Sequence, residues 1–406
     1  MERIYVDHNA TTPPAPQVVA AMTEILEEQW GNPSSIHRFG QSVRHRVELA
    51  RSKVAGLIGA RDRELIFTSG GTESNNLVLR SALTADRLRS RTSPAVIITS
   101  PIEHASIEKP VEDLKEAGAH VVQLGVDASG RVAPDELAAV LRDHGSQGAW
   151  IFVTIQWANN ETGVLQSIEE LVEVCRYETR KSPACRILFH TDATQAVGKI
   201  PVDVKACGVD FLTCSAHKFH GPKGIGTLYA RTGARLRWRQ FGGSQERDRR
   251  GGTENVAGIV GMGTAAELAG AFVADRGAAK GAEARRDRFE DHLVRVLPGS
   301  VVHAHAAPRL WNTTNIGFAN VEAEAILIAL SEKGVCASVG AACSSGSLEP
   351  SPILLAMGIP ESLAHGSVRF SLSRFTDDDE IDQAIQIVPS IVQRLARILP
   401  LGADDR

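Results

Sequence analysis

Residues 210–224 read DFLTCSAHKFHGPKG, and this stretch indicates both a strand of the fold and the place where a ligand would bind. The run DFLTCS is apolar enough for a buried strand, and it breaks at Lys218 into a loop rich in glycine, proline and histidine. In open α/β sheets, ligands bind beyond the carboxyl ends of the strands. Most loop lysines are merely solvated, but Lys218 stands where a ligand would bind.

Six further runs have the composition of strands, at residues 64–69, 95–100, 120–126, 149–156, 186–192 and 224–230. Stretches with helical periodicity separate most of them. This alternation predicts a mainly parallel, seven-stranded sheet that helices cover on both faces. The strands at 210–215 and 224–230 have no helix between them, so we expect one of the two to run antiparallel.

The pattern changes after about residue 258. A helical stretch over 259–297 is followed by short strands and helices in an order typical of a smaller α+β domain. The sequence therefore predicts an α/β fold with a large domain at 13–258. Residues 1–12 and 259–406 are expected to form the small domain.

Composition excludes several classes of protein. The 406 residues carry a net charge of −4 and show no basic stripe, which argues against a nucleic-acid partner. We see no apolar run of the roughly 18 residues that cross a bilayer, and the first residues, MERIYVDHNATT, lack the features of a signal peptide. The expectation is a cytoplasmic protein without a membrane partner.

Polar residues follow several of the other predicted strands. They include Gly71 and Thr72 in SGGTESNN, His104 in SPIEHAS, Asn160 in WANNETG and Asp192 in HTDATQ. Each has an ordinary explanation by itself, such as a turn or a helix cap. Structural requirements alone do not easily explain why so many polar residues follow strands at the same edge of the sheet.

Together with Lys218, these groups match the requirements of one cofactor. A lysine amine whose pKa is lowered by burial and cationic neighbours can form a Schiff base with an aldehyde. Asp192 would keep a pyridine nitrogen protonated, and the glycine-rich start of a helix suits a phosphate. These are the requirements of pyridoxal phosphate.

Two more residues stand out in the predicted small domain. Cys343 lies in SVGAACSSGSLEP, among residues too small and polar for a packed core, so we expect it to be reactive, whereas the other five cysteines suit core positions. Arg369 lies in SVRFSLSRF and is suited to gripping a carboxylate, the alternative being a surface salt bridge.

Eight motifs in order resemble those of the cysteine desulfurases, a group of pyridoxal-phosphate enzymes within the class V aminotransferases. They are FTSGGTESNN, PIEHAS, WANNETG, HTDATQAVGK, SAHKFHGPKG, RRGGTEN, SVGAACSSGSLEP and SVRFSLSRFT. The resemblance covers nearly the whole chain and is strongest to the nitrogen-fixation branch, although the general iron–sulfur branch shares most motifs. It implies fold type I of the pyridoxal-phosphate transferases and a homodimer.

The resemblance also assigns roles to residues that hold the cofactor. It implies that Lys218 carries pyridoxal phosphate, that Asp192 pairs with the ring nitrogen, and that His104 stacks on the ring and moves protons. Thr253 would reach the phosphate from the partner subunit. The remaining implied contacts are Gln195 and Asn160 at the ring, and Gly71, Thr72, Ser215 and His217 at the phosphate.

For the substrate, the resemblance implies L-cysteine. Arg369, helped by Asn32, would bind its carboxylate, and Cys343 would accept its sulfur as a persulfide while L-alanine leaves. The persulfide would pass to an iron–sulfur scaffold or another acceptor protein. No intrinsic metal site is implied, although Cys343 could transiently ligate a nascent iron–sulfur cluster.

The cysteine loop departs from the family pattern, because VGAACSSGS stands where SGSACTSGS is more usual. VGAAC also resembles selenocysteine lyases, which share the fold and the lysine. A selenocysteine lyase is therefore the alternative function. An aminotransferase and a non-catalytic sulfur carrier that keeps the fold are two further alternatives. A P-loop nucleotide-binding protein is not expected, since HGPKG and SGGTE lack the G-x-x-x-x-G-K-[ST] spacing.

Overall fold

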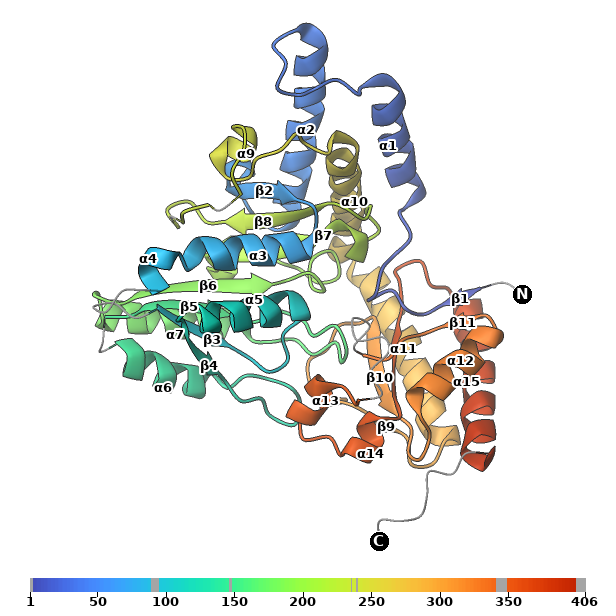
Figure 1. Ribbon diagram of the computed structural model, residues 1–406. Coiled ribbons are helices and arrows are strands. Elements are labelled where there is room, and N and C mark those ends of the chain that lie inside the picture. Colours follow the sequence, from blue (N-terminus) through green and yellow to red (C-terminus); the bar gives the residue numbers. More distant parts are fainter. Residues whose placement is uncertain are drawn as a thin grey trace.

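Seven strands form the central sheet, in the order β2-β8-β7-β6-β5-β3-β4 (Figure 1). The computed structural model describes residues 3–88, 95–145, 148–234, 236–238, 240–340 and 349–398. The strands are β2 Leu65–Thr68, β3 Ala95–Thr99, β4 His120–Gln123, β5 Trp150–Thr154, β6 Arg186–Asp192, β7 Phe211–Ser215 and β8 Gly226–Ala230. All seven predicted strands are confirmed. Strand β8 runs antiparallel to both β2 and β7, as expected for one of the last two strands.

Alternate residues of each strand point to opposite faces, and both faces are buried except along the edge strand β4, whose residues are half-buried or exposed. In β2, for example, Ile66 packs in one apolar cluster while Leu65 and Phe67 pack in another. The first face is covered by α3 Gly71–Ala82 and α5 Ala105–Glu116. The second is covered by α1 Pro16–Glu28, α2 Arg38–Leu57, α6 Pro134–Gly145, α7 Ile168–Lys181 and α10 Val256–Ala274. Burial on both faces explains why the strands read as continuous apolar runs.

Short elements complete this part of the chain. They are η1 Asp62–Glu64, α4 Ala85–Leu88, α8 Val204–Cys207, η2 Ala216–Lys218 and α9 Gln245–Asp248. The 3-10 turn η2 follows β7 directly. It therefore places Lys218 at the carboxyl end of a central strand.

A second core lies beside the sheet, at the lower right of Figure 1. Strand β10 Thr313–Gly317 pairs antiparallel with β12 Ser367–Ser371 and with β9 Val301–Val302, while β1 Ile4–Tyr5 pairs parallel with β11 Val335–Cys336. The helices here are α11 Arg276–Val296, α12 Ala323–Glu332, α13 Pro352–Ala356, α14 Glu361–Ala364 and α15 Asp378–Ile398. Because β1 joins this layer, the N-terminal segment lies between the two cores.

The predicted helical stretch over 259–297 consists of two helices, α10 and α11. They are divided at Asp275, whose Oδ1 accepts hydrogen bonds from the N–H groups of Gly277 at 2.9 Å and Ala278 at 3.0 Å. Helix α10 packs against α1 and α2. The domain boundary at residue 258 stays a prediction, but it falls within the first turn of α10.

Helix α10 is also long and apolar enough to cross a membrane, with a mean hydropathy of 1.6, and the sequence expectation of no such run overlooked it. More than half of it, 56%, is buried inside the fold. A buried core helix passes the same test of length and composition. The helix is therefore weak evidence for a membrane partner.

Candidate active site

A cavity of about 650 Å³ lies at the carboxyl ends of the central strands, and residues of β12 and of the segment before α13 also line it. It collects most of the predicted site residues. Those in its wall are Gly71, Thr72, His104, Asn160, Asp192, Gln195, Ser215, His217, Lys218 and Arg369. Because these residues come from both cores, the site depends on how the two layers pack together.

Lys218 is held on the main chain of the N-terminal segment. Its Nζ donates to the carbonyl oxygens of Asn9 at 2.6 Å and Ala10 at 2.8 Å. These carbonyl oxygens attract a proton-bearing amine but carry no formal charge. The two hydrogen bonds thus hold the amine in a defined position, partly buried in the cavity wall. Lys218 is therefore not a solvated loop lysine.

Asp192 is the last residue of β6 and is 7% exposed. Its Oδ1 accepts from the N–H of Thr194 at 2.9 Å, and its Oδ2 accepts from Nδ2 of Asn75 at 2.7 Å. Asn75 also donates to Oγ of Ser106 at 2.8 Å. Two donors therefore hold the carboxylate in place in the cavity wall. This suits a carboxylate that pairs with a cationic atom of a ligand.

His104 both caps α5 and lines the cavity. Its Nδ1 accepts from the N–H of Ser106 at 3.1 Å. Burial lowers the pKa of His104, an effect that Asp192 opposes and Lys218 reinforces. The imidazole is consequently neutral at neutral pH, and a neutral ring can stack on an aromatic ligand and accept a proton.

The start of α3 has the features of a phosphate site. This helix begins at Gly71, and its N-cap residue is Gly70, which has no side chain that could cap the first N–H groups. The hydroxyl of Thr194 is buried and has no hydrogen-bond partner among the described residues, and a Cβ at Gly71 would lie 3.1 Å from it. Unpaired donors at a helix N-terminus favour an anion. This part of the cavity therefore fits the phosphate of pyridoxal phosphate.

His217 lines the same cavity as the start of α3, and its Nδ1 is 3.1 Å from Oγ1 of Thr11. Burial lowers the pKa of His217 to about 4, with contributions from Lys218, Lys223 and Lys199. The ring is therefore neutral at neutral pH. It can donate one hydrogen bond without adding a charge to a site that already holds several cations.

Arg369 is 1% exposed, so the alternative of a surface salt bridge is wrong. Its Nη2 donates to Oδ1 of Asp7 at 2.7 Å, and its Nη1 donates to the carbonyl oxygen of Asn160 at 3.0 Å. Its Nε is buried without a partner among the described residues. A buried guanidinium with an unused donor, in the wall of a cavity, suits the carboxylate of an amino acid.

Two predicted residues are not in this cavity wall, and a third cannot be placed. Asn32 and Thr253 are exposed and do not line the cavity of a single chain. Cys343 lies outside the described residues, but Gly340 before it and Glu349 after it both line the cavity. Of the other cysteines, four are buried and Cys336 is half-buried, which agrees with core positions.

Sequence reasoning missed three buried polar residues that organise the site: Asn9, Asn75 and Lys199. Asn75 stands in the quoted motif SGGTESNN, four residues after Gly71, so helical spacing could have found it. Asn9 has no local signal, because Lys199 and Lys218 are about two hundred residues away from it in the sequence. Lys199 lies four residues after Gln195, to which it donates, so helical spacing could have indicated that pair but not the contact with Asn9.

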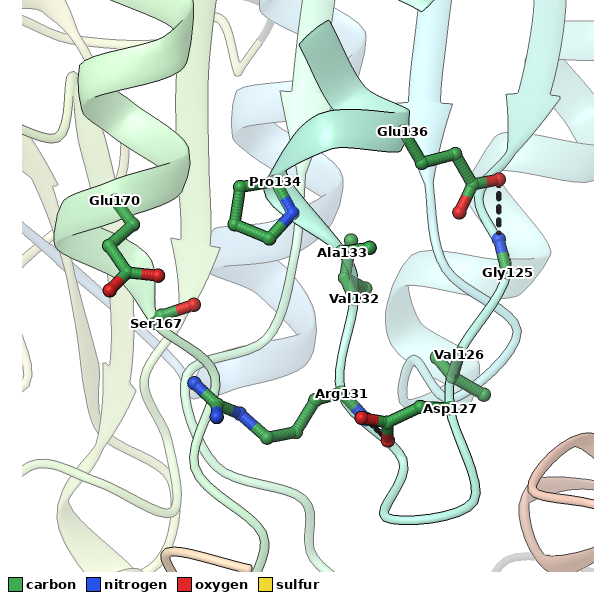
Figure 2. Close-up of a pocket in the computed structure, with 10 residues that line it drawn as sticks. All are labelled: Gly125, Val126, Asp127, Arg131, Val132, Ala133, Pro134, Glu136, Ser167 and Glu170. Atoms are coloured by element: carbon green, nitrogen blue, oxygen red, sulfur yellow. Dashed lines mark hydrogen bonds between the residues drawn. The ribbon is translucent and has the colours of Figure 1, made fainter. Parts of the chain in front are cut away.

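A second cavity, of about 410 Å³, lies between the segment after β4 and the start of α7 (Figure 2). It contains none of the predicted site residues. Two of its carboxylates serve the local fold: Oε1 of Glu136 accepts from the N–H of Gly125 at 3.0 Å, and Oδ1 of Asp127 accepts from the N–H groups of Ser129 and Arg131. The cavity at the edge of the sheet is therefore the candidate active site.

Comparison with known proteins agrees with this geometry. The model of the aminotransferase class-V family matches residues 4–384. A cysteine desulfurase 2 of Trichormus variabilis is 46% identical over all of this chain and 96% of its own length. The cysteine desulfurase NifS of Azotobacter vinelandii is 44% identical over 98% of this chain and 95% of its own length. Among solved structures, a NifS-like protein superposes with a TM-score of 0.86 at 33% identity, over 97% of this chain and all of the other.

The chain belongs to the class-V aminotransferases, enzymes of the pyridoxal-phosphate fold type I. Within that family it falls among the cysteine desulfurases, which confirms the resemblance drawn from the motifs. The names of these relatives do not favour the selenocysteine lyase alternative. They include both NifS and IscS, so they are compatible with either branch.

Proposed function

We propose that this enzyme uses pyridoxal phosphate to take the sulfur from L-cysteine, releasing L-alanine and leaving a persulfide on Cys343. The observation that carries the proposal is the meeting of four groups at one cavity: the amine of Lys218, the carboxylate of Asp192, the uncapped start of α3 and the guanidinium of Arg369. The known relatives of this chain and its fold support the same reaction.

In the proposed reaction each part of the cavity has one task. Lys218 would hold the cofactor and afterwards take the proton from the α-carbon of the substrate. Asp192 would face the ring nitrogen, and His104 would stack on the ring. When bound, the cofactor supplies an electron sink for the bond that is broken at the α-carbon. Gln195 and Asn160 would lie at the ring, with Gly71, Thr72, Ser215 and His217 at the phosphate.

The sulfur transfer itself would take place on Cys343. The thiolate of Cys343 attacks the substrate sulfur and forms the new S–S bond. The bond between that sulfur and the β-carbon of the substrate breaks, its electron pair stays on carbon, and carbon takes up a proton. The products are alanine and a cysteine persulfide, so atoms and electrons balance without an external oxidant. Arg369 would hold the substrate carboxylate throughout.

We propose that the enzyme works as a homodimer. The α1 helix and the segment after it expose large apolar side chains: Leu26 is 65%, Trp30 73% and Ile36 95% exposed. Thr253 and Asn32 are exposed and absent from the cavity of their own chain. A second copy that covers this apolar face could bring Thr253 to the neighbouring phosphate, and the same arrangement would explain why Asn32 does not meet Arg369 within one chain.

We further propose that the enzyme acts in the cytoplasm and that its persulfide supplies iron–sulfur cluster assembly through a scaffold or another acceptor protein. The NifS and IscS names among its relatives support a role in nitrogenase maturation or in general cluster assembly. A pull-down with candidate scaffolds, followed by transfer of labelled sulfur from the persulfide, distinguishes the two roles.

The central test uses Cys343→Ala, Lys218→Ala and, as a matched control, Cys336→Ala. Cys343→Ala is expected to bind the cofactor, seen as a visible absorption band, and to release no sulfide from cysteine. Lys218→Ala is expected to lose the band of the native protein and most activity. Cys336→Ala should keep both. Sulfide release at the native rate by either of the first two variants, or a colourless wild-type protein that does not take up pyridoxal phosphate, would refute the proposal. Parallel assays with selenocysteine and alanine separate it from a selenocysteine lyase and an aminotransferase.

A further inference from the structure

Lys199 is a buried lysine next to the site that the proposed reaction does not use. It is 6% exposed, and its Nζ donates to Oε1 of Gln195 at 2.5 Å and to Oδ1 of Asn9 at 2.8 Å. Its carbonyl oxygen accepts from Nε1 of Trp311 at 2.8 Å. The hydrogen-bond partners of the amine are thus neutral amide oxygens. Within the described part of the chain, the amine makes no salt bridge.

The surroundings of Lys199 are basic. Burial lowers the pKa of Lys199 well below its ordinary value, and Lys218 and Arg369 lower it further. The other titratable groups that face it are His8, His217, His220 and Arg374. Burying an amine here without a carboxylate costs free energy, so its presence is not explained by stability of the core.

The hydrogen bonds of Lys199 decide how the amide of Gln195 is oriented. The amine of Lys199 donates to the oxygen of Gln195, so this oxygen faces Lys199 and the NH2 group of Gln195 faces away. That NH2 group donates to the carbonyl oxygen of Asn9 at 2.9 Å, which also accepts from Lys218 at 2.6 Å. Gln195 lines the cavity. Its second N–H therefore remains for a ligand acceptor such as the ring oxygen of the cofactor.

Asn9 is the second group that Lys199 fixes. The side chain of Asn9 accepts from Lys199 and from Nδ2 of Asn312 at 3.1 Å, and its own Nδ2 donates to Oγ1 of Thr313 at 2.8 Å. The same residue supplies the carbonyl oxygen on which Lys218 rests. Lys199 thus positions both the carbonyl oxygen that accepts from Lys218 and the NH2 group of Gln195 that can donate to the cofactor ring.

We propose that Lys199 is a positioning residue with two roles. It turns the NH2 group of Gln195 toward the ring oxygen of pyridoxal phosphate, and it holds Asn9 in the position where its carbonyl oxygen accepts from Lys218. This inference rests on the proposed function and deepens it, because it assigns the site a buried lysine that does not itself react. An amide turned the other way would present its oxygen to the anionic ring oxygen and repel it.

The test compares Lys199→Met, which removes the donor at nearly equal length, with Lys199→Gln, which keeps a donor. Lys199→Met is expected to weaken the binding of pyridoxal phosphate about tenfold, as the loss of one buried hydrogen bond does. It should also shift the pH midpoint of the visible band upward by about half a unit or more, because the hydrogen bond that Lys199 directs to the ring oxygen through Gln195 is lost. Lys199→Gln should stay within about threefold of wild type. The exposed Lys205→Met is the matched control and should change nothing.

A double-mutant cycle shows whether Lys199 acts through Gln195. In a Gln195→Leu background, Lys199→Met should weaken binding by less than about twofold further. A full tenfold loss in that background, equal losses in Lys199→Met and Lys199→Gln, or a band midpoint that does not move would overturn the inference. Failure of Lys199→Met to fold would also overturn it, since the residue would then serve the fold. If wild type and Lys205→Met bind no pyridoxal phosphate, the proposed function fails instead.

Discussion

Nη2 of Arg369 donates to Oδ1 of Asp7 over 2.7 Å, and this ion pair ties β12 to the N-terminal segment in the wall of the cavity. The pair leaves Nε of Arg369 unpaired within the part of the chain that the structure describes. A buried cation with one charge-neutralising partner and one unused donor is organised in advance for an anionic ligand. If the substrate carboxylate binds here, as proposed, it needs little rearrangement of the site.

Arg369→Lys should raise the KM for cysteine about tenfold or more and leave the cofactor bound. A lysine keeps the charge, but it cannot hold Asp7 and a carboxylate together in the planar geometry of a guanidinium. Steady-state sulfide release and the visible spectrum measure the two effects. Arg288→Lys is the control, because Arg288 makes an exposed ion pair with Asp378 and should not affect either quantity. An unchanged KM in Arg369→Lys would remove Arg369 from the substrate site.

Asp192→Asn should lower kcat by about a hundredfold or more with little loss of folded protein. The amide has the shape of the carboxylate and can still accept from Thr194, but it cannot stabilise a positive charge on the cofactor ring. Single-turnover release of sulfide gives the rate. Asp203→Asn, at the cap of α8, is the matched control for loss of an aspartate charge elsewhere. A variant at position 192 with native kcat would show that the carboxylate is only a structural cap.

Glu103→Gln should stabilise the enzyme relative to wild type increasingly as the pH rises from about 6.5 to 8. Burial raises the pKa of Glu103 from 4.5 to about 8, so over this range the folded protein holds a proton that the unfolded chain has released. The free energy that Glu103 contributes to folding is therefore complete below 4.5 and lost as the pH rises through 8. Urea unfolding of the holoenzyme at several pH values measures the difference, with the exposed Glu116→Gln as control. A difference that does not vary with pH would contradict the raised pKa.

Gly340→Ala should destabilise the fold by about 1–3 kcal/mol, the usual cost of overpacking. A Cβ at this position would overlap the carboxylate of Glu161, which is 2% exposed and accepts a hydrogen bond from Oγ of Ser351 at 2.6 Å. Gly281→Ala is the opposite case, since nothing lies near that position in α11, and it should be neutral or stabilising. The midpoints of urea unfolding compare the two. Equal midpoints would mean that Glu161 moves aside without cost.

Ile36→Asp should weaken the proposed homodimer without unfolding the chain. Ile36 is 95% exposed, so a charge there is harmless to one subunit, but it would be buried if a second copy covers this face. Sedimentation over a range of concentrations measures the dissociation constant. Ile328→Asp, on α12 and 66% exposed, is the control outside this face. If Ile36→Asp and Ile328→Asp sediment identically to wild type, the dimer uses another surface.

The sequence predicts the sheet and much of the site for one physical reason. Buried parallel strands are continuous apolar runs, and their ends are where the first polar residue appears. Asp192 and Lys218 follow directly from that pattern. The family motifs add residues, such as Gln195, whose roles no spacing would have shown.

What local sequence does not show are the contacts between distant segments. Lys199 looks like a loop lysine until Asn9, 190 residues earlier, is placed against it. The ion pair of Arg369 with Asp7 likewise joins residues far apart in the sequence, and it forms where the N-terminal segment pairs with β11 and with Ser371 of β12. Asn32 and Thr253 differ from these residues. If two chains share the site, as proposed, the surface of one chain is not enough to show which residues belong to it.

The grip of Asn9 and Ala10 on Lys218 uses main-chain oxygens, which every amino acid has. Alanine scanning along this segment would therefore leave the two acceptors in place and understate how far the segment holds the amine of Lys218. A shortened or displaced N-terminus would reveal it. Affinity tags and fusion partners for this enzyme are accordingly better attached to the other end of the chain.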